Sequence, residues 1–162
     1  IGVYHSLQTS SYAQWQQAWQ DTLATNLLGA ANLSYCAGQV MRQQGGGRIV
    51  NISSRGAFRG EPIKPAYGAS KAALNSLTQS LAVGLAADNI FVAAVAPGFI
   101  NTELTADRLA SEEGDEICGQ SPLGRVAEPE EVAYAAMFLA SSGAEFTTGT
   151  ILDVNGASYL RS

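Results

Sequence analysis

The sequence predicts an α/β fold built on a parallel β-sheet with helices on both faces. Three short segments, 48–53, 90–96 and 150–154, are apolar or β-branched and lack the polar alternation of a half-exposed strand. Uniformly apolar strands are typical of parallel sheets that are covered on both sides. Helical segments separate these strands along the chain, and this alternation favours a doubly wound α/β arrangement.

Apolar residues at helical spacing predict two long helices. The first covers 12–43, and Asn26 and Gly29 are expected to weaken or bend its middle. Gly45-Gly46-Gly47 ends it. The second helix covers about 66–87, where leucines recur on one side and small residues permit close packing.

Two further helical segments follow the second strand. Residues 101–119 mix apolar and acidic side chains, and we expect them to form a mobile helical lid. Pro129 and the acids around it suit the first turn of another helix, because proline lacks the unpaired N–H there and carboxylates stabilise a helix N-terminus. This helix is expected to end near Gly143.

Length and charge limit the classes of function. The 162 residues fit one domain, which we expect to span 1–162. A hydrophobic content of 46% is enough for a buried core. The net charge of −5 argues against nucleic acid or an anionic membrane as the main partner. No apolar run approaches the length that spans a bilayer, and the first residues do not resemble a secretion signal.

Cysteine and histidine are scarce. Cys36 and Cys118 lack metal-ligand spacing, and two thiols make a poor disulfide framework. We expect Cys36 to be a buried free thiol and Cys118 to be more exposed, and both suit a reducing cytoplasm. His5 is the one histidine, so we expect no metal site, and we predict that His5 lies at the surface.

The most informative pattern is Tyr67-Gly68-Ala69-Ser70-Lys71, at the start of the second long helix. A phenol and an ammonium four residues apart share one face of a helix. Ser54 follows the first strand, so its hydroxyl can point to the same place. A Tyr-x-x-x-Lys pair alone is common in helices. In combination with Ser54 on a strand–loop–helix frame, it predicts a proton-transfer site for carbonyl and alcohol redox chemistry.

The turn Pro97-Gly98-Phe99-Ile100-Asn101-Thr102 follows the second strand. Open α/β sheets bind ligands at the carboxyl ends of their strands, which is where this turn lies. Gly98 permits close backbone approach, and Pro97 fixes the turn. A turn that merely ends the strand is the alternative. Because the same sequence contains the Ser–Tyr–Lys pattern, a ligand-binding turn is the better interpretation.

These motifs resemble those of the short-chain dehydrogenase/reductase family, most closely its 3-oxoacyl-[acyl-carrier-protein] reductase-like branch. The resemblance implies the C-terminal portion of a Rossmann-like doubly wound parallel sheet, and an oxidoreductase that interconverts a carbonyl (ketone or 3-oxoacyl) and a secondary alcohol. By this resemblance Ser54 polarises the substrate oxygen and Tyr67 donates or accepts the proton. Lys71 holds the nicotinamide ribose and lowers the pKa of the phenol, and Asn26 organises a water that leads to Lys71.

The same resemblance implies NAD or NADP as the cofactor. The expected contacts are Tyr67, Lys71 and four residues of the turn: Pro97, Gly98, Ile100 and Thr102. The family's Gly-rich pyrophosphate turn is not found, because Gly45-Gly46-Gly47 precedes a strand whereas such a turn follows one. Ile1-Gly2 resembles the residues just after the family's Asn-Asn-Ala-Gly element. The first strand is therefore expected to carry an unpaired apolar edge.

The substrate is less constrained. Arg55, Arg59 and Lys64 lie near the expected site, with Glu61 as the one opposing charge. These cations could bind an acidic carrier protein or a phosphate-bearing thioester. It is equally consistent with the sequence that they are ordinary solvated charges on a loop. Acids of the lid would repel an acidic carrier. We expect a small carbonyl, alcohol or acyl-thioester substrate, with no nucleic acid and no membrane partner.

Other assemblies and functions stay open. The small residues of the second helix are compatible with the homodimer or homotetramer that the resemblance implies, and equally with packing inside one protomer. A different class of function is an inactive fragment or a noncatalytic oligomerisation partner, since the dinucleotide-binding half is not found in the sequence. A hydrolase is disfavoured, because no Gly-x-Ser-x-Gly element is present and the adjacent Ser70 and Lys71 point apart on a helix.

Overall fold

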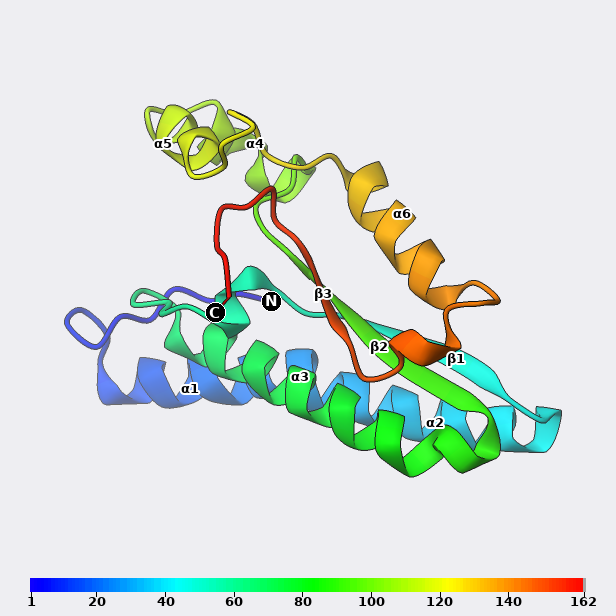
Figure 1. The fold of residues 1–162 in the computed structure, drawn as a ribbon. Helices are drawn as coiled ribbons and strands as arrows, with labels where there is room; N and C mark the ends of the chain where they lie inside the picture. The colour runs from blue at the N-terminus through cyan, green and yellow to red at the C-terminus, as the bar shows by residue number, and fades with distance from the viewer. Residues whose placement is uncertain (162) are drawn as a thin grey trace.

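The computed structural model describes residues 1–161 and has a three-stranded parallel sheet at its centre, in the order β1-β2-β3 (Figure 1). The strands are β1 (Gly47–Ile52), β2 (Ile90–Pro97) and β3 (Ile151–Val154). Pairing runs from Gly47 opposite Ile90 to Ile52 opposite Val95, and from Ala94 opposite Ile151 to Pro97 opposite Val154. Within the described residues β1 forms one edge of the sheet, where Ile52 is exposed.

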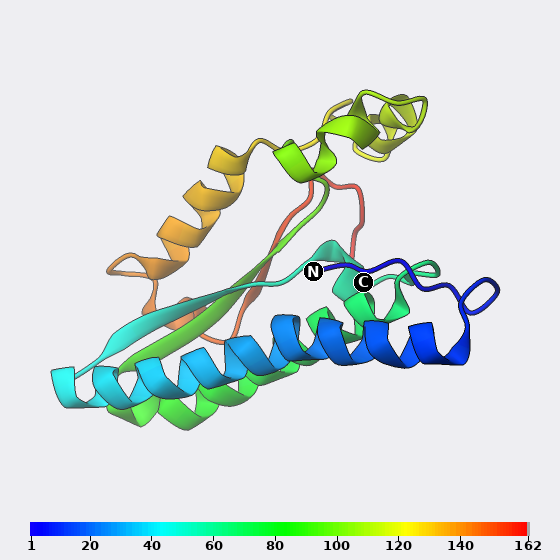
Figure 2. The same ribbon diagram turned by 180° about the vertical axis from the view of Figure 1, so that it is seen from behind.

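Helices cover both faces of this sheet, as the two opposite views show (Figures 1 and 2). On one face lies a long rod made of three consecutive elements, α1 (Tyr12–Leu23), η1 (Ala24–Gly29) and α2 (Ala30–Gln44), beside α3 (Pro65–Leu85). On the other face lies α6 (Pro129–Ala140). The predicted α/β class, with a parallel sheet between two helical layers, is confirmed.

The apolar run of β2 faces a separate core on each side. Ala93 and Val95 pack against α6, where Val132 and Leu139 are buried. Ile90 and Val92 pack in a second cluster with Ala82 of α3 and with partly buried residues of α2, α3 and β1. Successive side chains of a strand point to opposite faces, so a strand enclosed on both sides must be apolar throughout.

The long rod contains a π-helical turn, η1, at the place where the sequence predicts a bend. Asn26 lies in this turn and is buried. Single π-helical turns within α-helices are frequent at functional sites, because they redirect a side chain. Here the side chain of Asn26 reaches across to α3, where its amide donates a hydrogen bond to Ser70 Oγ at 3.1 Å.

Local sequence sets the helix ends. Ser11 and Gln14 form a capping box at the start of α1, and Glu128 and Glu131 form one at the start of α6. Both α3 and α6 have proline in their first turn. Gly45 ends α2 in the left-handed conformation, with φ of 85°. No helix within residues 1–161 is long and apolar enough to cross a membrane.

Shorter elements complete the fold: η2 (Arg55–Ala57), η3 (Ala86–Asp88), α4 (Glu103–Leu109), α5 (Glu113–Gly119) and η4 (Glu145–Thr147). We call α4 and α5, with the turn that joins them, the lid. It projects beyond the carboxyl ends of the strands (Figure 1). The helical prediction for 101–119 is confirmed as two short helices rather than one.

The two cysteines and the histidine lie in environments that differ from those predicted. Cys36 is exposed, not buried, and Cys118 is partly buried rather than the more exposed of the two thiols. The buried face of α2 follows Ser34 and Gly38, four residues apart, and Cys36 falls between them on the opposite side of the helix.

His5 is buried, with 2% of its surface exposed, although a surface position was predicted. Its Nδ1 lies 2.7 Å from the carbonyl oxygen of Val3, and its Nε2 accepts a hydrogen bond from the Ala66 N–H at 3.2 Å. The imidazole packs edge-on against Trp15, with ring centroids 5.4 Å apart. These contacts join the N-terminal loop to the start of α3.

Candidate active site

A cleft of about 550 Å³ lies at the carboxyl ends of β1 and β2, between the start of α3 and the lid. Its wall contains six of the eight residues for which the sequence suggests a catalytic or cofactor role: Ser54, Tyr67, Pro97, Gly98, Ile100 and Thr102. The other two, Asn26 and Lys71, are not among the residues that line the cleft. The fold thus brings together segments that are far apart in the sequence.

Two adjacent serines at the end of β1 have different surroundings. Ser54 lines the cleft, and its Oγ accepts a hydrogen bond from the Gly56 N–H at 3.0 Å, which caps η2. Ser53 is buried, with its hydroxyl 3.4 Å from the carbonyl oxygen of Lys71. Because neighbouring side chains of an extended backbone point to opposite sides, only Ser54 faces the cleft.

Tyr67 lies in the first turn of α3, directly after Pro65 and Ala66. Burial and the nearby charge of Glu61 raise the pKa of the Tyr67 phenol, and the neighbouring Ser54 side chain acts in the opposite direction. The sequence suggests instead that Lys71 lowers this pKa. Desolvation disfavours the phenolate more than the neighbouring groups favour it, so the phenol of this structure is held in its neutral, proton-donating form.

Lys71 is one helical turn beyond Tyr67. Its Nζ donates a hydrogen bond to the carbonyl oxygen of Ile52 at 2.8 Å and lies 5.9 Å from the centroid of the Tyr67 ring. Burial lowers the pKa of Lys71. The last carbonyl of β1 therefore fixes the ammonium beside the phenol.

Asn26 reaches α3 through a residue that the sequence analysis does not single out for this role. Its Nδ2 donates to Ser70 Oγ at 3.1 Å and to the Ile1 carbonyl oxygen at 2.8 Å. Ser70 Oγ in turn donates to the Tyr67 carbonyl oxygen at 2.7 Å. This path ends on the backbone of Tyr67, not on the ammonium of Lys71.

The turn after β2 is held against the C-terminal segment. The Gly98 N–H donates to the Val154 carbonyl oxygen at 3.0 Å. A Cβ at Gly98 would lie 3.2 Å from Asn155 Cα, so a side chain there would force the two segments apart. Thr102 then starts α4, where its hydroxyl lies 3.1 Å from Thr105 Oγ1 in a capping box. Glycine and threonine are thus both needed for the local path of the chain.

Arg55 is buried, with 5% of its surface exposed, so the interpretation of this residue as a solvated loop charge is wrong. Its guanidinium donates to Ser158 Oγ at 2.5 Å and to Gln120 Oε1 at 2.8 Å. It also lies 5.6 Å from the centroid of the Phe99 ring. Arg55 therefore joins η2, the end of the lid and the C-terminal segment.

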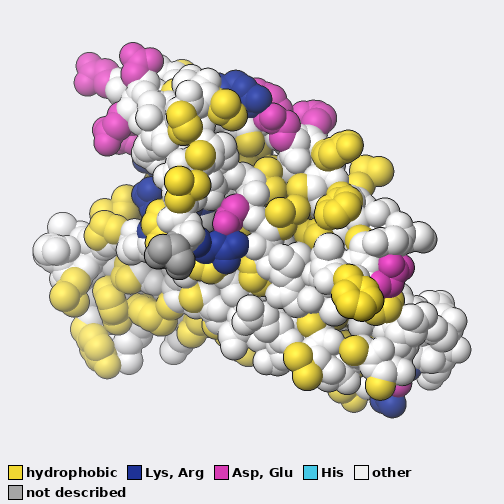
Figure 3. Space-filling view, in the orientation of Figure 1, with side chains coloured by type: hydrophobic (Ala, Val, Ile, Leu, Met, Phe, Trp, Pro, Cys, Tyr) yellow, Lys and Arg dark blue, Asp and Glu magenta, His cyan; other side chains and the backbone are white. Residues whose placement is uncertain are grey.

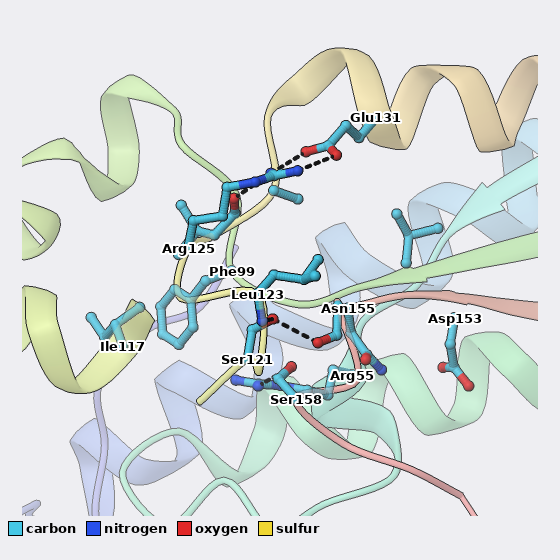
Figure 4. A pocket seen from close by; sticks show the side chains of 14 residues that line it. Arg55, Phe99, Ile117, Ser121, Leu123, Arg125, Glu131, Asp153, Asn155 and Ser158 are labelled. Atoms are coloured by element: carbon cyan, nitrogen blue, oxygen red, sulfur yellow. Dashed lines mark hydrogen bonds and ion pairs between the residues drawn. The ribbon is translucent and has the colours of Figure 1, made fainter. Parts of the chain in front are cut away.

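Arg108 is a cleft residue that the sequence analysis overlooks. It is the single basic residue in the acidic stretch 101–119, and that contrast is a signal that could have identified it. A second, smaller pocket of about 150 Å³ adjoins the cleft, shares Arg55 and Phe99 with it, and is drawn in Figure 4.

Two polar contacts lie in the wall of the smaller pocket. Arg125 forms a double hydrogen bond with Glu131, and this contact lowers the pKa of the Glu131 carboxyl to about 2 (Figure 4). Ser121 Oγ donates to the Gly156 carbonyl oxygen at 2.6 Å. Within residues 1–161, no group of three or more His, Cys, Asp or Glu side chains is placed to hold a metal ion.

Comparison with known proteins identifies the family. The family model described as Enoyl-(Acyl carrier protein) reductase matches residues 1–157. The chain is 43% identical over 152 residues to a 3alpha-hydroxysteroid dehydrogenase of Mediterraneibacter gnavus, a match that covers 94% of this chain and 60% of that protein. It is 43% identical over 141 residues to the 3-oxoacyl-[acyl-carrier-protein] reductase FabG of Aquifex aeolicus, covering 87% of this chain and 56% of that protein.

A solved structure shows the same fold. The gluconate 5-dehydrogenase from Burkholderia cenocepacia, in complex with NADP and tartrate, matches with a TM-score of 0.88 at 28% identity, covering 98% of this chain and 61% of that one. This chain thus spans less than two thirds of the length of these relatives. It belongs to the short-chain dehydrogenase/reductase family, and its three strands form part of the Rossmann-like sheet of that family.

Proposed function

We propose that this chain carries the catalytic portion of an NAD(P)-dependent oxidoreductase that interconverts a ketone or 3-oxoacyl carbonyl and a secondary alcohol. The observation that supports this proposal most directly is the cleft that Ser54 and Tyr67 share with the turn after β2. The Ser54 side chain lies close enough to the Tyr67 phenol to influence its pKa, so their hydroxyl groups can meet one substrate oxygen. Family membership supports the same reaction class.

The residues of the cleft fit the nicotinamide end of NAD or NADP. Gly98 contributes backbone without a side chain to the cleft wall, and Ile100 and Thr102 stand beside it. These residues would hold the nicotinamide, while Lys71 would hold its ribose. The cofactor, when bound, supplies or accepts the hydride. The Burkholderia cenocepacia relative was solved with NADP, which supports this assignment.

In the proposed mechanism, the protein's own groups manage the oxygen and its proton. Ser54 Oγ polarises the carbonyl, and Tyr67 Oη donates the proton during reduction or accepts it during alcohol oxidation. Because burial keeps the phenol neutral, the proton is available at neutral pH. The Lys71 ammonium stabilises the phenolate once the proton has left. Asn26, acting through Ser70, holds the backbone of Tyr67 in place.

We also propose that the protein is a homo-oligomer of the reducing cytoplasm. Leu33 and Val40 of α2 and Val83 of α3 are exposed apolar side chains on the two long helices. Contact between these helices of two protomers would cover them. Light scattering of the purified protein tests this idea, and a monomer at micromolar concentration would contradict it.

The direct test of the reaction is Tyr67→Phe in the full-length protein, which keeps the ring and removes the transferable proton. We expect kcat for ketone reduction to fall at least about 100-fold, the usual contribution of a positioned acid. Tyr134→Phe, at an exposed position on α6, is the matched control and should leave kcat unchanged. Near-normal turnover of Tyr67→Phe would show that the assigned proton donor is wrong.

Cofactor binding separates the oxidoreductase from a noncatalytic oligomerisation partner. Titration of the full-length protein with NADH and NADPH, followed by fluorescence, should give saturable binding of at least one of them. No saturable change with either would favour the noncatalytic alternative.

A further inference from the structure

The cleft collects positive charge in an otherwise acidic protein. The chain has a formal net charge of −5 with nine Lys and Arg residues. Four of these line the cleft: Arg55, Arg59, Lys64 and Arg108. The one carboxylate in the cleft wall is Glu61. An electropositive cleft in a chain of the opposite net charge points to a ligand with negative charge.

The four cations differ in how they are already paired. Arg108 pairs with Glu113 on the lid at 2.7 Å, and Arg55 bonds the neutral groups of Ser158 and Gln120. Arg59 is only loosely paired, with its Nε 3.8 Å from Glu61 Oε1.

Of the four cleft cations, Lys64 is the one whose ammonium lies over the ring of Tyr67. It takes part in no ion pair within residues 1–161, and its Nζ lies 4.7 Å from the centroid of the Tyr67 ring. A contact with the face of an aromatic ring satisfies an ammonium only in part. Lys64 can therefore bind an anion beside the reacting oxygen.

The cations of the cleft repel one another. Burial lowers the pKa of Lys64 most strongly, and the charges of Arg108, Arg59 and Arg55 lower it further, against the opposing influence of Glu61. Like charges held close together in a partly desolvated cleft destabilise the empty site. A bound anion relieves this repulsion.

The lid argues for a small ligand rather than an acidic protein. Its outer surface carries exposed acids, including Asp107, Glu112, Asp115 and Glu116. Figure 3 shows acidic side chains gathered over α4 and α5, at the top left of that view. An acidic carrier would meet this surface first and be repelled, whereas a small anion can pass beneath it into the cleft.

We propose that the substrate is a compact carbonyl compound with an anionic group, held by Lys64 and Arg59 a few carbon atoms from the reacting carbonyl. This inference rests on the proposed function and adds the substrate class to it. In the reduction, the carbonyl carbon gains a hydride from the reduced nicotinamide cofactor and the oxygen gains the proton of Tyr67. The product is a secondary alcohol with its anionic group unchanged, together with the oxidised cofactor.

The test compares matched charged and neutral ketones on the full-length protein. One pair is 4-oxopentanoate and its methyl ester, and the other is dihydroxyacetone phosphate and dihydroxyacetone, so that a carboxylate and a phosphate are distinguished. We expect kcat/KM for the better anion to exceed that of its neutral partner about tenfold or more, the range of a charge-assisted hydrogen bond. In Lys64→Gln this ratio should fall about tenfold.

Arg42→Gln is the matched control, because Arg42 lies on α2 in an ion pair with Asp88, away from the cleft. The ratio should not change in this variant. A ratio near one in both pairs, or a ratio that Lys64→Gln leaves unchanged, would overturn the proposal. So would a Lys64→Gln variant whose main defect is weaker NADPH binding, since the cations would then serve the cofactor.

Calorimetry separates failure of this inference from failure of the proposed function. If no ketone is reduced, yet an anion binds more tightly than its neutral partner and loses this advantage in Lys64→Gln, the anion site stands and the redox function is wrong. If anionic and neutral ketones bind alike, the anion site is wrong, whatever the turnover.

Discussion

The floor of the cleft and the lid above it are built in opposite ways. The floor consists of the carboxyl ends of β1 and β2 and the first turns of α3, and it rests on strands such as β2 that are almost wholly buried. The lid has two helices of seven residues each, in which only Gly114 and Ile117 are buried. Proton transfer needs fixed distances, so its groups lie on the sheet side. In the proposed function the lid, which has few buried contacts, is the element expected to admit the substrate.

Arg55 is the main side-chain link between these two regions. It lies in η2, just after the carboxyl end of β1, and it bonds Gln120 at the end of the lid and Ser158 of the C-terminal segment. Three features can therefore be tested separately: the buried sheet beneath the floor, the weakly packed lid, and the buried side chain of Arg55, which we call the tether.

Matched leucine substitutions should give the largest difference. Leu139 in α6 is 4% exposed and packs on the sheet, whereas Leu104 in the lid is 95% exposed. We expect Leu139→Ala to lower the free energy of unfolding by about 2–5 kcal/mol. Leu104→Ala should change it by at most about 0.5 kcal/mol. Urea denaturation followed by tryptophan fluorescence measures both, and equal losses would show that the lid is packed as firmly as the core of the sheet that supports the floor.

Loss of the tether should have an intermediate effect. Arg55→Met removes two hydrogen bonds from a buried charged group, and we expect a loss of about 1.5–3 kcal/mol in the free energy of unfolding. Hydrogen exchange should quicken around Gln120 and Ser158 while β2 stays protected. Arg125→Met removes an exposed ion pair and should cost at most about 1 kcal/mol. Uniformly faster exchange in Arg55→Met would mean that Arg55 supports the whole fold instead.

The pH dependence of ketone reduction should depend on Tyr67 in the floor and not on the lid. Burial raises the pKa of Tyr67 above its ordinary value of 10.0, and reduction requires the protonated phenol. The value of kcat/KM for ketone reduction should therefore stay level through neutral pH. It should fall about tenfold per pH unit only above the raised pKa. Leu104→Ala should leave this profile unchanged, and a decline that starts near pH 7 would contradict the neutral phenol.

Thiol labelling compares a cysteine outside the lid with a cysteine inside it. The difference in their reaction rates should be the smallest of the effects predicted here. Cys36 is exposed on α2, and Cys118 is partly buried in α5 of the lid. We expect Cys36 to react faster with a thiol reagent, without loss of stability. In Arg55→Met the reaction of Cys118 should accelerate and that of Cys36 should not. Unchanged labelling of Cys118 would show that the tether does not hold α5.

The strands and long helices could be predicted because the type of side chain at each position indicates whether that position is buried. β2 reads as a continuous apolar run since both of its faces are covered, and Asn26 marks an interruption in a helix because it is polar among apolar neighbours. The positions of Ser54 and Tyr67 on one cleft follow from a strand, a loop and a helix that are consecutive in the chain.

What could not be predicted depends on residues distant in the sequence. The burial of Arg55 requires Gln120 and Ser158, and that of His5 requires Trp15 and Ala66. No local pattern shows that such partners will meet. The direction of the Tyr67 pKa was missed for the same reason, because desolvation arises from the whole surroundings and not from Lys71 alone.

The π-helical turn makes the length of the long rod as important as its composition. Such a turn holds one residue more than an α-helical turn, so every later residue is rotated by about 100° from the position it would have in an unbroken α-helix. Deleting a single residue within 24–29 would cancel this rotation, so Ser34 and Gly38 would keep their buried contacts, but the turn that directs Asn26 towards α3 would be lost. We therefore expect a one-residue deletion in this segment to preserve the packing of α2 and to break the contact between Asn26 and Ser70.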